Sequence, residues 1–295
     1  MSSMTLPSAA QLLQYLISGL TLGTIYGMIA LGFTLIHNAT GIVNFAQGEF
    51  VAFGALITIW ASGTLGLPIP LAVLMAVAGV TLLGAALERA AIRPARRASV
   101  ITLIIITIGA SILLRGIAMW LWGPDALPMR HFASEEPIGI AGASILPQHV
   151  WIVAIVLVTM LALWLLGERT QVGKAMRACA GDREAAQLVG IPAPRMVTLS
   201  FALSGTLGGL AGAIVCPLAM GQYNMGIMLG LKGFCAAILG GMGNPLGAVL
   251  GGLLLGVLES LGAGLRSGFK DAIAFGIMLI VLLAKPTGLL GRRRA

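Results

Sequence analysis

The sequence predicts an all-α fold, a polytopic transmembrane bundle of about eight to ten spans that includes broken or re-entrant helices. Only 9% of the 295 residues are charged and 58% are hydrophobic, whereas a soluble domain carries about 25% charged residues. Such a chain has too few charges to cover a surface in water, so lipid is its expected solvent. The 41 glycines favour the same class, because glycine lets helices approach closely in a bilayer.

Apolar segments lie in the long gaps between charged residues, and each is a candidate span because a crossing needs roughly 20 mainly apolar residues. The second and seventh segments are short, which favours broken or re-entrant helices there. We expect a single transmembrane domain over residues 1–295. In chain order, the nine segments cover residues 12–36, 46–61, 71–87, 100–122, 150–166, 196–218, 229–239, 246–261 and 272–284.

Basic residues predict the orientation. They gather at 89–97, 169–195 and 285–294, and the positive-inside rule places such regions in the cytoplasm. The connection 123–149 holds one basic residue, Arg130, and several prolines, so we expect it outside and irregular. Nine crossings then put the N-terminus outside and the C-terminus inside. The net charge of +8 reflects this topology, with anionic lipid as a partner and no nucleic acid.

Two polar or glycine-rich interruptions divide apolar runs, at residues 38–48 and 240–245. Non-helical backbone is tolerated inside a bilayer only where protein or a water-filled cavity satisfies it, and discontinuous helices often mark transport pathways. Each interruption is therefore either a turn at the membrane surface or part of a pathway. Asn44 and Gln47, in the first, are candidate pathway residues.

Four ionisable residues fall in or near the predicted spans. Glu49, Arg115 and Lys232 lie close to span ends, where a side chain can reach the interface. Glu259 is the strongest candidate for burial. A buried glutamate here either pairs with another residue for structural reasons or takes part in transport. Glu49 and Glu259 complete the candidate pathway. No series of Asp, Glu or His resembles a proton relay, which weakens an ion-coupled secondary transporter.

The polar segment 168–195 is predicted to hold a cytoplasmic helix pair. Val172 begins an apolar stripe at helical spacing that ends at Cys179. Gly181 then breaks the helix, Asp182 is a good N-cap for a second helix, and Gly190 ends it. This second helix can dock into a groove of another protein, or it can lie on lipid.

Motifs of catalysis are missing from the sequence. There is no GxxxxGK[ST] phosphate loop, no HExxH and no GxSxG, and the three His and three Cys are scattered. We therefore expect no catalytic residue, no metal and no cofactor. If transport is driven by ATP, the ATPase must be a separate subunit.

Several runs resemble a known family. Asp182-Arg183-Glu184-Ala185-Ala186, followed by Gly190, resembles the coupling loop of ABC importer permeases. The runs 27–36, 43–50, 200–212, 240–248 and 285–289 are similar to branched-chain amino acid permeases of the LivH type. They occur in order between about residues 19 and 290. Gln47 departs from the family pattern, which more often has His there.

The resemblance implies the permease subunit of an ATP-driven importer for branched-chain amino acids in the bacterial inner membrane. Its partners would be a second homologous permease, two ABC ATPase subunits and a periplasmic substrate-binding protein. Related permeases carry urea or short amides, so those cargoes stay open. A secondary transporter and a purely structural subunit also remain alternatives. The residues implied in ATPase coupling are Asp182, Arg183, Glu184, Ala185, Ala186 and Gly190.

Overall fold

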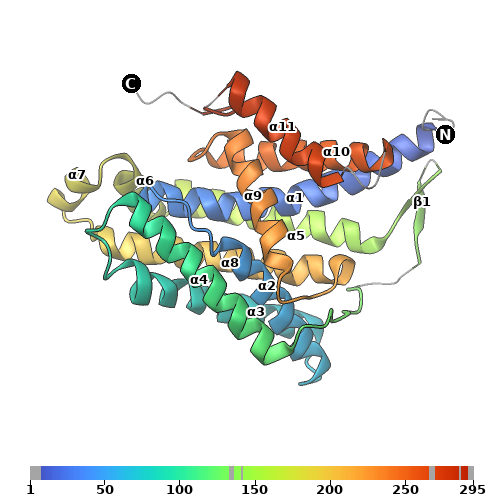
Figure 1. Cartoon of the computed structure of the whole chain (residues 1–295), viewed down its shortest axis with the longest axis horizontal. Coiled ribbons are helices and arrows are strands. Elements are labelled where there is room, and N and C mark those ends of the chain that lie inside the picture. Colours follow the sequence, from blue (N-terminus) through green and yellow to red (C-terminus); the bar gives the residue numbers. More distant parts are fainter. Residues whose placement is uncertain (1–7, 133–135, 141, 266–269, 286, 292–295) are drawn as a thin grey trace.

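The computed structural model of the chain describes residues 8–132, 136–140, 142–265, 270–285 and 287–291. These residues form a helical bundle with one short hairpin (Figure 1). The elements are α1 (Ala9–Thr40), α2 (Gln47–Gly63), α3 (Ile69–Leu87), the π-helix η1 (Glu88–Ile92), α4 (Val100–Trp122), β1 (Ile138–Ile140), β2 (Ala143–Ile145), α5 (Pro147–Arg169), α6 (Gln171–Gly181), α7 (Arg183–Leu188), α8 (Ala193–Ala219), α9 (Met225–Gly240), α10 (Pro245–Leu265) and α11 (Lys270–Ala284).

The predicted fold class is confirmed, since each of the nine apolar segments lies on a helix. In the described part of the chain, six helices are long and apolar enough to cross a membrane: α1, α3 continued by η1, α4, α5, α8 and α10. As expected, the second and seventh segments are shorter, with 17 residues in α2 and 16 in α9. The chain is therefore a multi-pass membrane protein.

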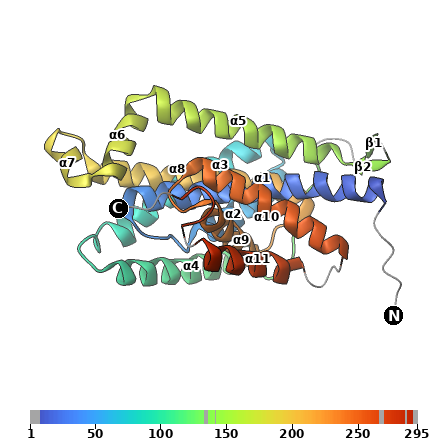
Figure 2. The same ribbon diagram turned by 90° about the horizontal axis from the view of Figure 1, so that it is seen from above.

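The bundle has central and peripheral helices. The most apolar stretches of α1 and α8 are 83% and 72% buried, whereas that of α5 is only 11% buried. Figure 2 shows α4 and α5 on opposite sides of the central helices. The exposed large side chains of α5 are valine, leucine and tryptophan, as expected for a helix whose solvent is lipid.

Glycines allow α1 and α10 to approach closely. A Cβ added at Gly252 would lie 2.2 Å from the backbone nitrogen of Gly27, and one at Gly256 would lie 2.3 Å from that of Gly23. No L-residue with a side chain fits at such distances. The four-residue glycine spacing in the sequence therefore serves tight packing of these two backbones.

The two ends of the bundle differ. Helices α6 and α7 lie at one end, and the hairpin lies at the other, beside the start of α1 (Figure 1). The connection before α5 was expected to be irregular, but Ile138 pairs with Ile145 in an antiparallel ladder. The expectation is therefore confirmed for residues 123–132 and wrong for the short hairpin, where the prolines flank the strands and leave their backbone groups free to pair. Glu135, Pro286 and Arg292–Arg294 lie outside the described residues.

The first interruption is inside the bundle. Gly41, with φ +75°, ends α1, and residues 41–46 run back among the helices before α2 begins. The backbone N–H of Phe45 donates to Oγ1 of Thr107 in α4, so neighbouring helices satisfy this non-helical segment. The second interruption is a tight turn between α9 and α10, and its Gly243 carbonyl accepts a hydrogen bond from Asn38 Nδ2.

Candidate functional site

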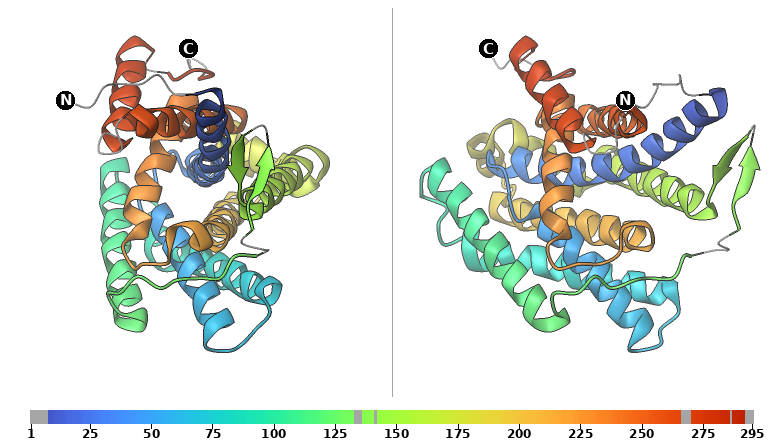
Figure 3. Two further views of the ribbon diagram at one scale, coloured as in Figure 1. Left: turned by 90° about the vertical axis from the view of Figure 1, so that its right-hand side faces the viewer. Right: turned by 45° about the vertical axis from the view of Figure 1, so that its right-hand side comes forward.

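Two separate ion-pair groups lie within the described part of the bundle. Arg115 Nη2 lies 2.8 Å from Glu49 Oε1, and Lys232 Nζ lies 2.9 Å from Glu259 Oε1 and 2.8 Å from Asp271 Oδ1. Glu49 is 1% exposed and Lys232 is 6% exposed. The prediction that these two reach the interface was wrong, because α2 begins inside the bundle and α9 crosses it steeply (Figure 3).

A cavity of about 260 Å³ lies between α1, α2, α4 and α9. Ser111, on its wall, is the central residue of α4, about 16 Å from either end of that helix at ~1.5 Å per residue. The cavity therefore lies at the mid-height of this candidate span, and transporters commonly bind their cargo near the midplane of the bilayer. Its lining residues are Phe33, Phe45, Glu49, Ile108, Ser111, Ile112, Arg115, Gly226, Ile227, Gly230, Leu231 and Phe234.

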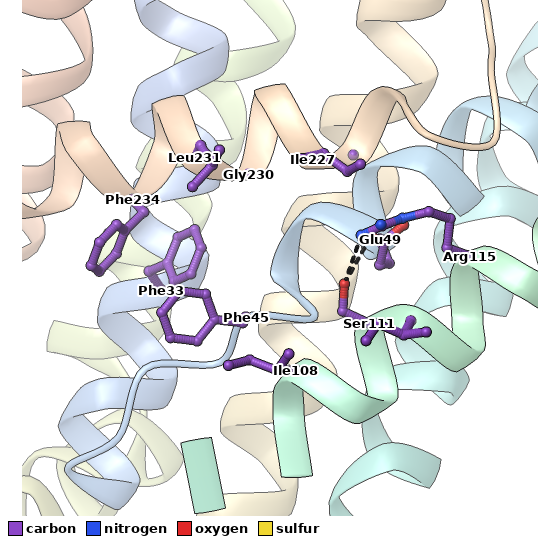
Figure 4. Close-up of a pocket in the computed structure, with 12 residues that line it drawn as sticks. Phe33, Phe45, Glu49, Ile108, Ser111, Arg115, Ile227, Gly230, Leu231 and Phe234 are labelled. Atoms are coloured by element: carbon purple, nitrogen blue, oxygen red, sulfur yellow. Dashed lines mark hydrogen bonds and ion pairs between the residues drawn. The ribbon is translucent and has the colours of Figure 1, made fainter. Parts of the chain in front are cut away.

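One end of the cavity is aromatic (Figure 4). The ring of Phe234, from α9, lies 5.8 Å from that of Phe33 in α1 and 5.7 Å from that of Phe45. Both pairs are tilted, a geometry that aromatic rings prefer. Three chain segments that are distant in the sequence thus meet in one apolar wall.

The other end of the cavity is polar (Figure 4). The hydroxyl of Ser111 donates to Glu49 Oε1 at 2.9 Å, and Arg115 Nη2 lies 3.2 Å from the Ser111 oxygen as well. Glu49 is in the first turn of α2, where the helix dipole favours a negative charge. The cavity therefore combines one carboxylate, one guanidinium and one hydroxyl with an apolar wall.

The predicted pathway residues separate into two places. Glu49 lines the cavity, whereas Asn44 and Gln47 are fully buried beside it. Gln47 ties α2 to α8, since its Nε2 donates to the Ser204 carbonyl and its Oε1 accepts from the Ser204 hydroxyl. Glu259 belongs to the other ion-pair group. The structure thus brings Asn44, Gln47 and Glu49 together and leaves Glu259 apart.

The helix pair predicted within residues 168–195 is present as α6 and α7. Asp182 caps α7, with its Oδ1 accepting hydrogen bonds from the N–H groups of Glu184 and Ala185 at 2.9 and 3.0 Å. Ala186 packs inward against Cys179 and Ala193, so it does not contribute to an outer face.

The outer surface of this loop is both charged and apolar. Leu188 and Val189 are 89% and 78% exposed, and Arg183 and Glu184 are exposed beside them. Gly190, with φ +87°, ends the loop's second helix and turns the chain toward α8. The exposed pair of aliphatic side chains is the feature that a docking partner would cover.

Residues 15–282 match the family described as branched-chain amino acid transport system / permease component. The chain belongs to this family. It is 36% identical to the high-affinity branched-chain amino acid transport system permease protein BraD of Pseudomonas aeruginosa, over 97% of this chain and 98% of that protein. It is 34% identical to the corresponding protein LivH of Escherichia coli, over 95% and 96% of the two chains.

More distant likenesses extend the comparison of this permease. It is 28% identical to the ribose import permease protein RbsC of Escherichia coli, over 80% of this chain and 74% of that protein. Among solved structures, PsaBC from Streptococcus pneumoniae in complex with Fab shares the fold with a TM-score of 0.51. The identity is 15%, and 92% of each chain is covered.

Sequence reasoning missed most of the cavity wall of this permease. Ser111 and the three phenylalanines had no distinguishing pattern, since single hydroxyl and aromatic residues are common in membrane helices. Arg115 did give a signal: it is a positive charge within the apolar helix α4, further from the helix end than expected, and Glu49 is a negative charge in another helix. Pairing unlike charges between spans is a general expectation in bilayers, and it would have found this contact.

Proposed function

We propose that this chain is the permease subunit of an ATP-driven ABC importer for branched-chain amino acids in the bacterial inner membrane. It assembles with a second homologous permease, two ABC ATPase subunits and a periplasmic substrate-binding protein. The family and the names of BraD and LivH support the cargo. The ATP is hydrolysed by the partner subunits, because this sequence has no phosphate-binding loop.

The capped helix pair at one end of the bundle is the observation that carries the coupling role. Asp182 fixes the start of α7, and Gly190 fixes its end, so Leu188 and Val189 are presented on a defined turn. Loop residues from Asp182 to Ala186 then transmit motion of an ATPase to α5 and α8, which are continuous with the loop. The contact with the ATPase subunit is thus formed or shaped by five residues, Asp182, Arg183, Glu184, Ala185 and Gly190. Ala186 anchors the loop from the inside.

The midplane cavity is the proposed position at which the cargo pauses on the translocation path. Glu49 lies in its wall, and Asn44 and Gln47 pack beside it. Its aromatic wall favours an aliphatic cargo over urea or a short amide, because such polar cargo gains little from phenylalanine rings. Glu259 remains a candidate for the path in a different conformation.

An importer assembled with its ATPase subunits and purified in detergent tests the coupling role. Leu188→Glu places a charge on the proposed docking surface, so we expect the ATPase subunits to dissociate and leucine-stimulated ATP hydrolysis to be lost. Leu65→Glu makes the same change at an exposed site in the α2–α3 connection and is the control, with ATPase subunits retained. Ion-gradient-driven leucine uptake by the purified chain alone would instead establish the secondary transporter.

A further inference from the structure

The geometry points to a binding site for the zwitterionic head group of an amino acid inside the midplane cavity. The ammonium group of the ligand contacts Glu49, its carboxylate contacts Arg115, and its aliphatic side chain lies against the phenylalanine wall. The inference rests on the proposed function and deepens it, because it names the residues that would recognise the free α-amino acid.

Glu49, in the cavity wall, has one acceptor that the described residues do not use. Its Oε1 accepts hydrogen bonds from Arg115 and Ser111. Its Oε2 is buried and has no hydrogen-bond partner among the described residues. A buried polar atom without a partner is costly. An ammonium group in the cavity would satisfy Oε2 with a charge-assisted hydrogen bond.

Arg115, which also lines the cavity, has a donor that the described residues do not use. Nη2 binds Glu49, but Nε is buried and has no hydrogen-bond partner in the described part of the chain. The guanidinium carries five N–H donors in a planar fork, a shape that matches a carboxylate. Arg115 can therefore hold Glu49 and a ligand carboxylate together.

The charge balance selects a zwitterion. The cavity holds one carboxylate and one guanidinium, so its net charge is zero. A ligand with one positive and one negative group leaves that balance unchanged, whereas a cation or an anion alone adds an uncompensated charge in a medium of low dielectric constant. The Glu49–Arg115 pair also competes with the ligand, which keeps binding weak enough for release.

Size and polarity of the remaining wall fit a small aliphatic amino acid. The cavity, of about 260 Å³, is below the roughly 300–1,000 Å³ of sites for drug-sized ligands. Phe33, Phe45 and Phe234 stand opposite the charged end (Figure 4). A leucine-like molecule, charged at one end and apolar at the other, matches this division.

The decisive variant removes both charges at once. Glu49→Gln with Arg115→Met leaves no lone buried charge, and neutral replacement of a buried ion pair is commonly tolerated by the fold. We expect ATP-dependent leucine uptake by the complete reconstituted importer to fall about tenfold or more, since two charge-assisted contacts are lost. If the pair were only structural, the double variant would transport as well as the wild type.

A matched control removes another polar pair between helices. Thr81 and Thr206 join α3 to α8 through their hydroxyl groups at 2.7 Å, and neither residue lines the cavity. Thr81→Val with Thr206→Val should therefore leave leucine uptake within about twofold of the wild type. A comparable loss in this control would show that the assay reports general damage and would overturn the assignment.

Ligand occupancy is tested directly with a diazirine analogue of leucine on the intact importer. We expect light to label peptides that contain Phe45, Ile108 or Phe234, with excess leucine protecting them. Leucinamide and 4-methylpentanoate, which lack one charge each, should protect poorly. Labelling confined to other segments, or equal protection by the singly charged analogues, would overturn the site.

The two proposals fail in different ways. If the wild-type complex shows no ATP-dependent leucine uptake, the importer function itself is wrong. If the wild type transports leucine and the doubly neutral variant does so equally, the importer stands and only the head-group site is lost.

Discussion

Lys232 Nζ lies 2.9 Å from Glu259 Oε1, which links α9 to α10 in the buried part of the bundle. The same ammonium reaches Asp271 in α11 and lies 5.7 Å from the centre of the Tyr26 ring in α1. One lysine therefore connects four helices. Its neighbours supply two carboxylates and an aromatic face, so its charge is well compensated despite burial.

Replacing this lysine should destabilise the fold strongly. Lys232→Met leaves the buried Glu259 without its cation, and breaking a buried pair in this way costs roughly 3–5 kcal/mol. Adding Glu259→Gln should recover much of that loss. The midpoint of detergent- or heat-induced unfolding measures both effects. Equal stability of the single and double variants would mean that the pair contributes nothing to the packing of α9 on α10.

The α1–α10 contact should not tolerate even one methyl group. In Gly256→Ala the added Cβ would meet Gly23 and Gly19 backbone atoms at 2.3–2.4 Å, so the helices must separate. Overpacking of this kind costs typically 1–3 kcal/mol. The yield of monodisperse protein and its thermal midpoint are the measurements.

Gly116→Ala in α4 is the matched control, because no atom lies within 4 Å of the Cβ position at Gly116. It should be neutral or stabilising by up to about 1 kcal/mol, since alanine is the better helix former. A loss of stability there equal to that of Gly256→Ala would contradict the contact argument.

The cap of α7 should control the order of the loop between α5 and α8. Asp182→Ala removes the acceptor for two N–H groups, a change that costs about 0.5–2 kcal/mol of helix stability. Hydrogen exchange at residues 183–188 should then speed up, and ATPase subunits should bind less tightly. Asp182→Asn retains a side-chain acceptor and should behave almost as the wild type. Unchanged exchange in the alanine variant would rule out the cap as the organising contact.

Gln47 and Ser204 should show strong coupling in a double-mutant cycle. Gln47→Ala alone leaves buried polar groups of Ser204 with fewer partners, at a cost of about 1–3 kcal/mol. In a Ser204→Ala background, Gln47→Ala should lower the stability by a smaller amount, because the Ser204 hydroxyl is already absent. Thermal unfolding of the four proteins gives the coupling. Additive losses would show that this contact does not join α2 to α8.

Local signals in the sequence predicted much of this molecule. Long uncharged runs located the helices because the cost of burying a charge in lipid acts on each residue separately. Asp182 and Gly190 marked the ends of α7 for a similar reason, since a cap bonds to atoms within the next few residues and glycine readily adopts positive φ. The membrane fold and the boundaries of α7 therefore followed from neighbours along the chain.

The tertiary structure alone decided what the buried charges do. Glu49 and Arg115 are 66 residues apart, and only the packing of α2 against α4 makes them a pair in a cavity. Phe33, Phe45 and Phe234 likewise become one wall because α9 crosses α1. Hydropathy shows which segments can lie in the bilayer, but it does not show which helices face each other. The sequence therefore determined the transmembrane helices, whereas the cavity depends on how these helices pack.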